Sequence, residues 1–220
     1  EMQRSLVGSE MCIRDSTSVG LAQSDEEMKE WLTSNKPNWG SKWQAGDVKY
    51  KDLTGEGEVT PGASTLENHG DLKRIGNNSP RYRVGLNLDA AWKGIDFSIF
   101  FQGVLKRDWM FDAGDPYFWG AGSGMWQAAC FEEHMDYWTP ENTDAYYPKP
   151  YFNETKNQQA QDAYMQKASY LRCKNIQLGY TLPTHITEKA GISNCRIYLS
   201  CDNLFTITGL SSVYDPEVFG

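Results

Sequence analysis

The sequence predicts an all-β chain, in which about four long antiparallel strands in two hairpins form a fragment of a transmembrane antiparallel β-barrel with long extracellular loops. Two observations predict this class. Apolar and polar residues alternate with period two over segments of about ten residues. The connections between these segments are alternately long and short, as in outer-membrane barrels. No apolar run approaches the ~18 residues that a transmembrane helix needs, which leaves strands as the means of crossing.

The composition excludes several classes of function. Lys and Arg number 21 against 29 Asp and Glu, so the net charge is −8 and there is no basic surface for nucleic acid. The five cysteines form no C-x-x-C pair, and the three histidines lack the spacing of metal ligands. No nucleophile elbow, phosphate-binding loop or zinc-protease motif occurs. We therefore expect no catalytic residue, no metal, no cofactor and no enzymatic activity.

The first sixteen residues stand apart from the rest of the chain. They contain no signal-peptide pattern, and the stretch RSLVGSEMCIRDS resembles translated sequencing-adapter read-through. We treat Glu1–Ser16 as a non-native segment, with an ordinary disordered terminus as the alternative, and leave it out of the fold prediction. Under the adapter interpretation, the reading frame begins inside a longer gene.

Residues 17–79 are expected to form an extracellular loop region with one short helix. Ser24 followed three residues later by Glu27 is a capping box, and Met28, Trp31 and Leu32 follow at helical spacing. The spacing predicts a helix from about Asp25 to Leu32.

A stretch within this region resembles the start of a calcium loop. Asp52-Leu53-Thr54-Gly55-Glu56-Gly57 has oxygen-bearing side chains at loop positions 1, 3 and 5 and glycine at position 6. Position 12 would be Ala63, where such a loop needs a bidentate Glu. We therefore predict a polar turn and no metal here.

The first hairpin is expected at residues 80–104. In RYRVGLNLDAAW, which ends at Trp92, every second residue from Tyr82 is apolar or aromatic. Lys93-Gly94 is a two-residue turn signal, and Ile95, Phe97, Ile99 and Phe101 then resume the alternation. The hairpin should therefore have one apolar face and one polar face.

The second hairpin is expected at residues 169–206. Ile176, Leu178, Tyr180 and Leu182 alternate with polar residues, and Cys195, Ile197, Leu199 and Cys201 do so again. If the alternation continues towards the N-terminus, Arg172 and Lys174 fall on the same face as Ile176 and Leu178. Because both residues are charged, we expect that end of the strand to lie in water. Six residues of the opposite parity should face the lumen of a barrel: Arg83, Asn87, Asp89, Gln102, Gln177 and Asp202.

Residues 105–168 are expected to be one long extracellular loop rich in aromatic residues. Trp and Tyr side chains present an apolar face with a polar edge, which suits contact with a sugar ring or a protein partner. Packing of the loop onto itself, or an interfacial girdle, would use the same residues. Five residues are our candidates for substrate or partner contact: Trp109, Trp119, Trp126, Tyr137 and Trp138.

Six blocks of sequence carry a family resemblance. In order, they are GDVKYKDLTGEG, IGNNSPRYRVGLNLDAAWKGIDFSIFFQGVLKRD, DYWTPEN, YLRCKNIQLGYTLP, RIYLSCDNLFTITG and YDPEV. Together they resemble the SusC/RagA group of TonB-dependent transporters over nearly everything from Leu21 to Gly220. The family usually has Asn and Asp where this chain has Thr54 and Glu56. This departure weakens any transfer of a metal site.

The resemblance implies a plugged outer-membrane barrel of roughly 22 strands. It also implies import of glycans or peptides, a SusD-like surface lipoprotein as partner, TonB as energy source, contact with outer-membrane lipid, and a Gram-negative host of the Bacteroidota. Only the C-terminal part of such a barrel is covered, with residues 207–220 as the start of a further extracellular loop, truncated before the last strand. The fragment alone is therefore not expected to transport.

Two alternatives remain open at this point. A secreted glycan-binding β-sandwich would pack the apolar faces of the two hairpins against each other, about 10 Å apart. A glycoside hydrolase fragment would need two carboxylates close together in one cleft. Acids beside His134 are the nearest approach to such a site in the sequence.

Overall fold

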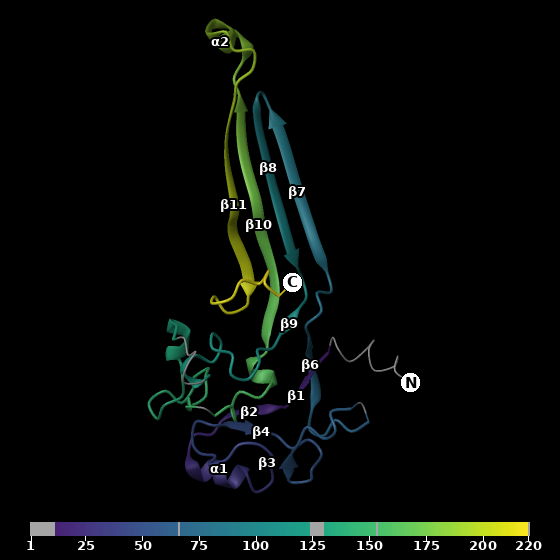
Figure 1. The fold of residues 1–220 in the computed structure, drawn as a ribbon, viewed down its shortest axis with the longest axis vertical. Coiled ribbons are helices and arrows are strands. Elements are labelled where there is room, and N and C mark those ends of the chain that lie inside the picture. Colours follow the sequence, from purple (N-terminus) through teal and green to yellow (C-terminus); the bar gives the residue numbers. More distant parts are fainter. Residues whose placement is uncertain (1–11, 66, 124–129, 153, 220) are drawn as a thin grey trace. The chain divides into compact units, whose positions relative to one another are not determined.

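The computed structural model describes residues 12–65, 67–123, 130–152 and 154–219. The chain divides into two compact units (Figure 1). The loop unit comprises Glu1–Asn78 and Asp108–Gln166, and the sheet unit comprises Ser79–Arg107 and Lys167–Gly220. In the part of the chain that the structure describes, no helix has both the length and the apolar character needed to cross a membrane.

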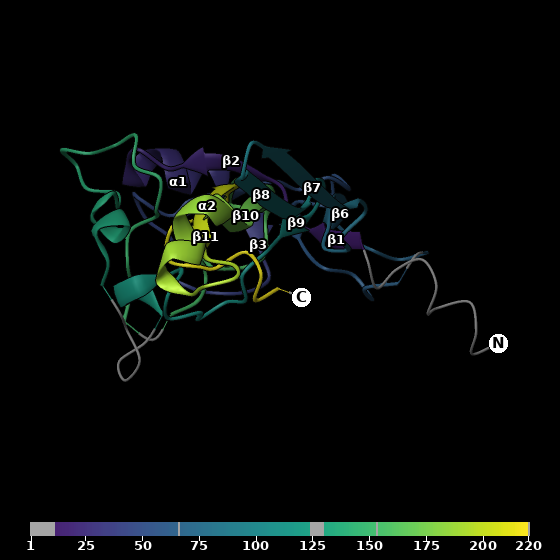
Figure 2. The same ribbon diagram turned by 90° about the horizontal axis from the view of Figure 1, so that it is seen from above.

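The sheet unit is built on four long antiparallel strands in the spatial order β11–β10–β8–β7. Figure 1 shows the strands side by side, and Figure 2 looks along them. Their bounds are β7 (Arg83–Trp92), β8 (Ile95–Val104), β10 (Gln166–Thr181) and β11 (Arg196–Gly209). The predicted four strands in two hairpins are therefore confirmed, although β10 and β11 are longer than the alternation indicated.

The first hairpin has the predicted register. Its ladder runs without interruption from Arg83 opposite Val104 to Trp92 opposite Ile95. Lys93 and Gly94 both have positive φ angles, of 47° and 87°. Two such residues form the turn whose twist matches the right-handed twist of the strands it joins.

The two hairpins join edge to edge in one sheet. β8 pairs with β10, so that Ile99 lies opposite Ile176 and Phe97 lies opposite Leu178. A β-sandwich would instead place these apolar side chains face to face between two sheets. The sandwich alternative is therefore wrong.

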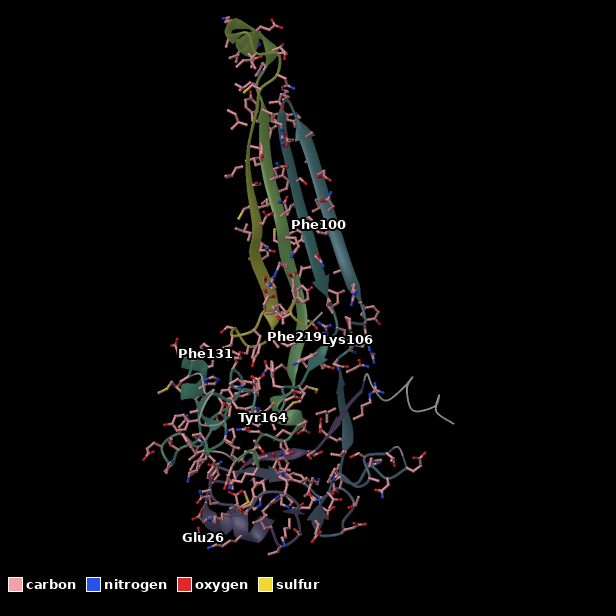
Figure 3. The ribbon with its side chains drawn as sticks, in the orientation of Figure 1. Glu26, Phe100, Lys106, Phe131, Tyr164 and Phe219 are labelled. Atoms are coloured by element: carbon pink, nitrogen blue, oxygen red, sulfur yellow. The ribbon has the colours of Figure 1, made fainter. Side chains whose placement is uncertain are left out.

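The sheet has one apolar face and one mainly polar face. Seven large side chains on the apolar face are exposed: Leu86 52%, Leu88 50%, Trp92 68%, Leu178 52%, Ile197 65%, Leu199 75% and Ile207 62%. The register places all six residues of the predicted polar parity on the other face. Phe100, labelled in Figure 3, lies opposite Asn87 and is an aromatic exception on that polar face.

A β-bulge at Lys174 corrects the predicted parity of β10. Phe100 and Phe101 are consecutive in β8, but they pair with Asn175 and Cys173 of β10, which leaves Lys174 as an extra residue. One extra residue in a strand reverses the faces to which the side chains beyond it point. Arg172 therefore pairs with Gln102 on the polar face. The expectation that Arg172 shares the face of Ile176 is wrong.

Gly179 allows an ion pair to cross a strand on the polar face. Arg196 of β11 donates from its Nε to Asp96 of β8 over 3.0 Å, although β10 lies between their strands. A Cβ on Gly179 would lie 2.5 Å from the Asp96 carboxylate. The missing side chain leaves room for the two charged groups to meet. Beyond β10, the connection to β11 contains α2 (Thr184–Thr187) and η4 (Glu188–Ala190).

The loop unit consists of short elements. β1 (Cys12–Asp15) pairs with β6 (Lys73–Asn77), and β2 (Ser18–Leu21) pairs with β4 (Val48–Tyr50). β3 (Lys36–Pro37) pairs in parallel with β5 (Glu58–Val59). The remaining elements are α1 (Asp25–Trp31), β9 (Asp108–Trp109), η1 (Gly120–Gly122), η2 (Glu132–Met135) and η3 (Asp162–Tyr164). The predicted long loop is thus folded together with residues 17–78.

The predicted helix ends one residue earlier than expected and has the predicted N-cap. The Ser24 hydroxyl accepts a hydrogen bond from the Glu27 N–H over 3.1 Å. The Glu27 carboxylate reaches back to the N–H of Gln23 at 2.6 Å, one residue before the cap. Met28 is fully buried beneath the helix.

Part of the excluded N-terminal segment takes part in the fold. Residues 1–11 lie outside the described residues, but Cys12–Asp15 form β1 in antiparallel register with β6. Ser16 is buried and forms a bridge to Gln161. Residues 12–16 are therefore part of the folded loop unit, while the adapter origin of Glu1–Ser16 stays a prediction.

Candidate ligand-binding site

An aromatic cluster forms the core of the second half of the loop unit. Phe118 and Trp119 meet edge to face at 4.9 Å between ring centroids, and Trp119 meets Tyr164 at 5.0 Å. Phe111 stacks on Phe118 at 4.5 Å. Tyr164, labelled in Figure 3, comes from the far end of the predicted loop. Edge-to-face pairs of this kind each stabilise the fold by about 0.5–1.5 kcal/mol beyond the effect of area burial.

A cavity of about 320 Å³ lies beside this cluster, and we call it the aromatic cavity. This volume is at the lower end of the range of ~300–1,000 Å³ that small-molecule pockets occupy. Aromatic, proline and amide side chains make up most of its wall. The lining includes Trp119, Ala121, His134, Tyr137, Tyr147, Lys149, Tyr151, Glu154, Asn157 and Gln158.

Two of the four predicted contact residues that the structure describes line this cavity. Trp119 and Tyr137 line it. Trp138 is buried in the core at 5% exposure, with its backbone N–H bonded to the Tyr147 carbonyl at 2.9 Å. Trp109 lies in β9 and is half-buried. Trp126 lies outside the described residues.

Several residues of the wall were not among the predicted contacts. Tyr147, Tyr151 and His134 line the cavity, and the first two belong to the run YYPKPY that ends at Tyr151. Prolines on both sides of Lys149 restrict the backbone of this run, and the tyrosines flank it. A rigid, aromatic, proline-bounded run within a long loop was the sequence signal for this part of the site.

The polar side chains of the wall are mostly engaged in holding the wall together. The Gln158 amide accepts from the Gly114 N–H at 2.8 Å and donates to the Gly122 carbonyl at 2.6 Å. The His134 imidazole accepts from the Phe131 N–H through Nδ1 at 3.0 Å, and its Nε2 lies 3.0 Å from the Tyr117 carbonyl. These two contacts favour the tautomer that carries its proton on Nε2.

The same contacts argue against His134 as a general acid or base that exchanges protons with the neighbouring carboxylates. Both of its ring nitrogens are occupied, and the nearby Asp136 carboxylate accepts from Asn142 Nδ2 and from the Tyr146 N–H, each at 3.1 Å. A glycoside hydrolase needs two carboxyl groups facing one glycosidic bond. This cluster of acids is a structural element of the loop.

A buried ion pair stabilises the wall of the aromatic cavity. Lys156 Nζ lies 2.9 Å from Asp47 Oδ2, and the two side chains are 2% and 0% exposed. The ammonium group also lies 4.0 Å from the centre of the Tyr151 ring. Asn157 donates to Asp47 Oδ1 at 2.8 Å and accepts from the Val48 N–H at 3.0 Å. The neighbouring wall residues Tyr151 and Asn157 are therefore anchored to the N-terminal half of the loop unit.

Burial sets the protonation of the tyrosines in the wall. Desolvation raises the pKa of the Tyr147 and Tyr151 hydroxyls well above the ordinary value, and nearby acidic groups add to this shift. Both tyrosines are therefore neutral hydrogen-bonding groups at physiological pH. Lys149 and Glu154 bring one cation and one anion to the lining.

The calcium-like stretch is a polar turn. The Asp52 carboxylate accepts hydrogen bonds from the N–H groups of Thr54, Gly55 and Gly57 at 2.6–2.8 Å. Donors occupy the carboxylate oxygens that a cation would need. Among the described residues, no group of three His, Cys, Asp or Glu side chains is arranged to hold a metal ion.

A charged cluster lies on the polar face of the sheet unit. The Arg172 guanidinium donates to Asp215 at 2.7 Å, to Glu217 at 2.8 Å and to the Thr206 hydroxyl at 2.7 Å. Lys174 adds a fourth contact by donating to Glu217 at 3.1 Å. The bulge thus turns both cations toward the acidic C-terminal segment.

Comparison with known proteins adds sequence and fold relatives. TonB-dependent receptor P3 of Formosa agariphila is 30% identical over 172 residues, which are 78% of this chain and 15% of the receptor. TonB-dependent receptor P26 of the same organism is 25% identical over 172 residues, 78% of this chain and 16% of the receptor. No family model matches the chain. The resemblance to SusC/RagA-like TonB-dependent transporters is confirmed.

Solved structures of this SusC/RagA-like group share the fold. The RagAB peptide transporter matches 95% of this chain and 20% of its own chain, with a TM-score of 0.60 and 23% identity. The RagAB peptide importer in its open-open state matches 94% of this chain with a TM-score of 0.59 and 22% identity. The antiparallel strands thus have the arrangement of a β-barrel of that group. The chain spans about 15% of the length of the curated receptors it matches.

Proposed function

We propose that the chain forms part of a TonB-dependent outer-membrane transporter that imports glycans or peptides. A SusD-like surface lipoprotein is the partner in this proposal, and TonB supplies the energy through parts of the transporter outside this chain. The host is a Gram-negative bacterium of the Bacteroidota. The two Formosa receptors support the class of protein, because their names state TonB dependence and their sequences match over 172 residues.

The two-faced sheet is the observation that carries the proposal. Seven of its large apolar side chains are half-exposed or more, Leu199 to 75%. Monomeric soluble proteins rarely expose a continuous apolar surface of this kind. Lipid would cover it in a barrel wall, while Asn87, Asp89 and Gln177 would face a water-filled lumen.

The loop unit is the proposed extracellular part, in contact with substrate and with the lipoprotein. Rigid aromatic loops suit both roles because Tyr and Trp bury large areas at small cost in conformational entropy. Of the predicted contact residues, Trp119 and Tyr137 are our candidates for substrate. Trp109, Trp126 and Trp138 stay candidates for contact with substrate or partner.

Single-cysteine labelling in intact cells tests the membrane arrangement. Leu88→Cys and Asn87→Cys would be introduced separately into the full-length transporter, with the native cysteines of the chain replaced by serine. We expect a lipid-restricted reagent to label residue 88 and a small water-soluble reagent to label residue 87. The reverse pattern would contradict the assigned faces.

Uptake experiments test the transport function. Deletion of the full-length gene should abolish growth on the imported nutrient as sole carbon source, and loss of TonB should have the same effect. Affinity purification of the transporter in mild detergent should also recover a lipidated partner protein. Normal growth of the deletion strain on every peptide and glycan tested would refute the proposal.

A further inference from the structure

A second cavity, of about 530 Å³, lies on the polar face of the sheet unit, and we call it the polar recess. Gly85 of β7 and Phe100 and Gln102 of β8 line it. Gly85 lies opposite Gln102, and a Cβ on Gly85 would meet nothing nearer than the Phe100 ring at 3.6 Å. The face therefore lacks a side chain at this point. A glycine inside a strand often marks a place where a ligand approaches the backbone closely.

The lining of the polar recess is positively charged. It includes Arg83, Arg107 and Lys174, and Glu217 is the only acid among its described residues. The Glu217 carboxylate already accepts hydrogen bonds from Lys174 at 3.1 Å and from Arg172 at 2.8 Å. This carboxylate is therefore not available to neutralise Arg83.

Arg83 is the cation that the recess offers to a ligand. It is exposed, and within the part of the chain that the structure describes its guanidinium forms no ion pair or hydrogen bond. Burial lowers the pKa of the neighbouring Arg107 guanidinium, and the positive charge of Arg83 lowers it further. An anion bound here would reduce the repulsion between the two guanidinium groups, and a cation would increase it.

Other acids of the polar face do not extend into the recess. Asp202 accepts from Asn175 Nδ2 at 2.7 Å, and Asp89 accepts from the Asn87 amide; neither acid is part of the lining that the structure describes. An anion in the recess would therefore meet mainly hydrogen-bond donors.

A second donor lies within reach of the same ligand group. The amide of Gln102 forms no hydrogen bond with the residues that the structure describes. Arg83 is two residues from Gly85, which pairs with Gln102, so Arg83 and Gln102 are diagonal neighbours on one face. Diagonal neighbours lie about 7–8 Å apart, which leaves room for one oxyanion between the ends of the two side chains.

We propose that the polar recess binds the oxyanion of a small molecule, a carboxylate or sulfate group, between the Arg83 guanidinium and the Gln102 amide. A planar guanidinium donates two parallel hydrogen bonds to such a group. The Phe100 ring, labelled in Figure 3, borders the recess and contacts the apolar part of the molecule. This inference goes beyond the proposed function and depends on it only for placing this face towards the lumen.

Saturation-transfer NMR of the purified full-length transporter in detergent tests the site. The probes are benzoate, its neutral isostere benzamide, and acetate, which keeps the charge but lacks the ring. We expect benzoate to bind about tenfold more tightly than either, and inorganic sulfate to displace it. Equal binding of benzoate and benzamide, or failure of sulfate to displace benzoate, would overturn the anion site. Equal binding of acetate and benzoate would overturn the contact assigned to Phe100.

Three variants locate the binding. Arg83→Gln removes the guanidinium and should abolish the preference for benzoate over benzamide. Arg81→Gln is the matched control, because it removes the same charge from an exposed residue outside the lining, and it should keep the preference. Gly85→Val fills the recess with a side chain that suits a strand, and it should abolish binding of benzoate. Heat-modifiable migration on gels shows that each variant is folded.

The outcomes separate this inference from the proposed function. A preference for benzoate that survives Arg83→Gln, or that Arg81→Gln abolishes equally, would overturn the site while transport stands. A preference that only Arg83→Gln abolishes, in a transporter whose deletion changes no uptake, would instead refute the proposed function and leave the anion site in place.

Discussion

Replacing Lys156 with Met should open the loop unit locally. The variant keeps most of the side-chain volume but leaves the Asp47 carboxylate, which is 0% exposed, without its cation. Two neutral donors remain on that carboxylate, the Gln44 N–H and Asn157 Nδ2, each at 2.8 Å. Removing one partner of a buried pair costs about 3–5 kcal/mol, because the other charge stays buried.

Hydrogen exchange of the full-length transporter in detergent measures this cost. At 1.4 kcal/mol per factor of ten, the amides of residues 44–50 and 156–158 should exchange roughly 100-fold faster or more, if they exchange by local opening. The double variant Asp47→Asn with Lys156→Met removes both charges and should recover most of the protection. Unchanged exchange in Lys156→Met, or a double variant worse than the single one, would refute the argument.

Three further predictions concern other parts of the chain. Leu88→Arg should destabilise the barrel by about 2–4 kcal/mol in urea unfolding, whereas Asn87→Arg on the other face should cost less than about 1 kcal/mol; equal costs would contradict the assigned faces. Ser24→Ala should cost about 1 kcal/mol and speed amide exchange in α1 alone, because it removes the N-cap acceptor. Burial raises the pKa of the Asp15 carboxyl to about 6, so the native state holds this proton more tightly than the unfolded chain. Protection of β6 should therefore fall as pH rises from about 4 to 6, and Asp15→Asn should abolish that dependence.

Local patterns were sufficient to predict the first hairpin and the helix. Alternation around Lys93-Gly94 defines both strands and their register, and Ser24 with Glu27 defines the start of α1. Each of these signals lies within a few residues of the structure it specifies. Alternation failed at Lys174, because a bulge depends on pairing with both neighbouring strands and leaves no mark on a single strand.

Long-range contacts explain why the loop unit was only partly predicted. The Asp47–Lys156 pair joins residues more than one hundred positions apart, and no periodicity connects them. Trp119 and Tyr137 line the aromatic cavity, and their role as contact residues stays a prediction. Trp138 is buried to the same degree as Trp119, at 5% against 6% exposure, but it does not line the cavity, and only the folded chain distinguishes the two.

The bulge at Lys174 also constrains how this part of the chain can diverge. Between the same two paired positions, β8 has no intervening residue, β10 has one, and β11 has two, Asn203 and Leu204. Gain or loss of one codon in any of these strands would shift the register of that strand against its neighbours. The side chains beyond the change would then move to the opposite face of the sheet, unless the adjacent strands changed at the same time. Related genes should therefore differ here by substitution, and insertions or deletions should collect in the loop unit and in the α2 connection.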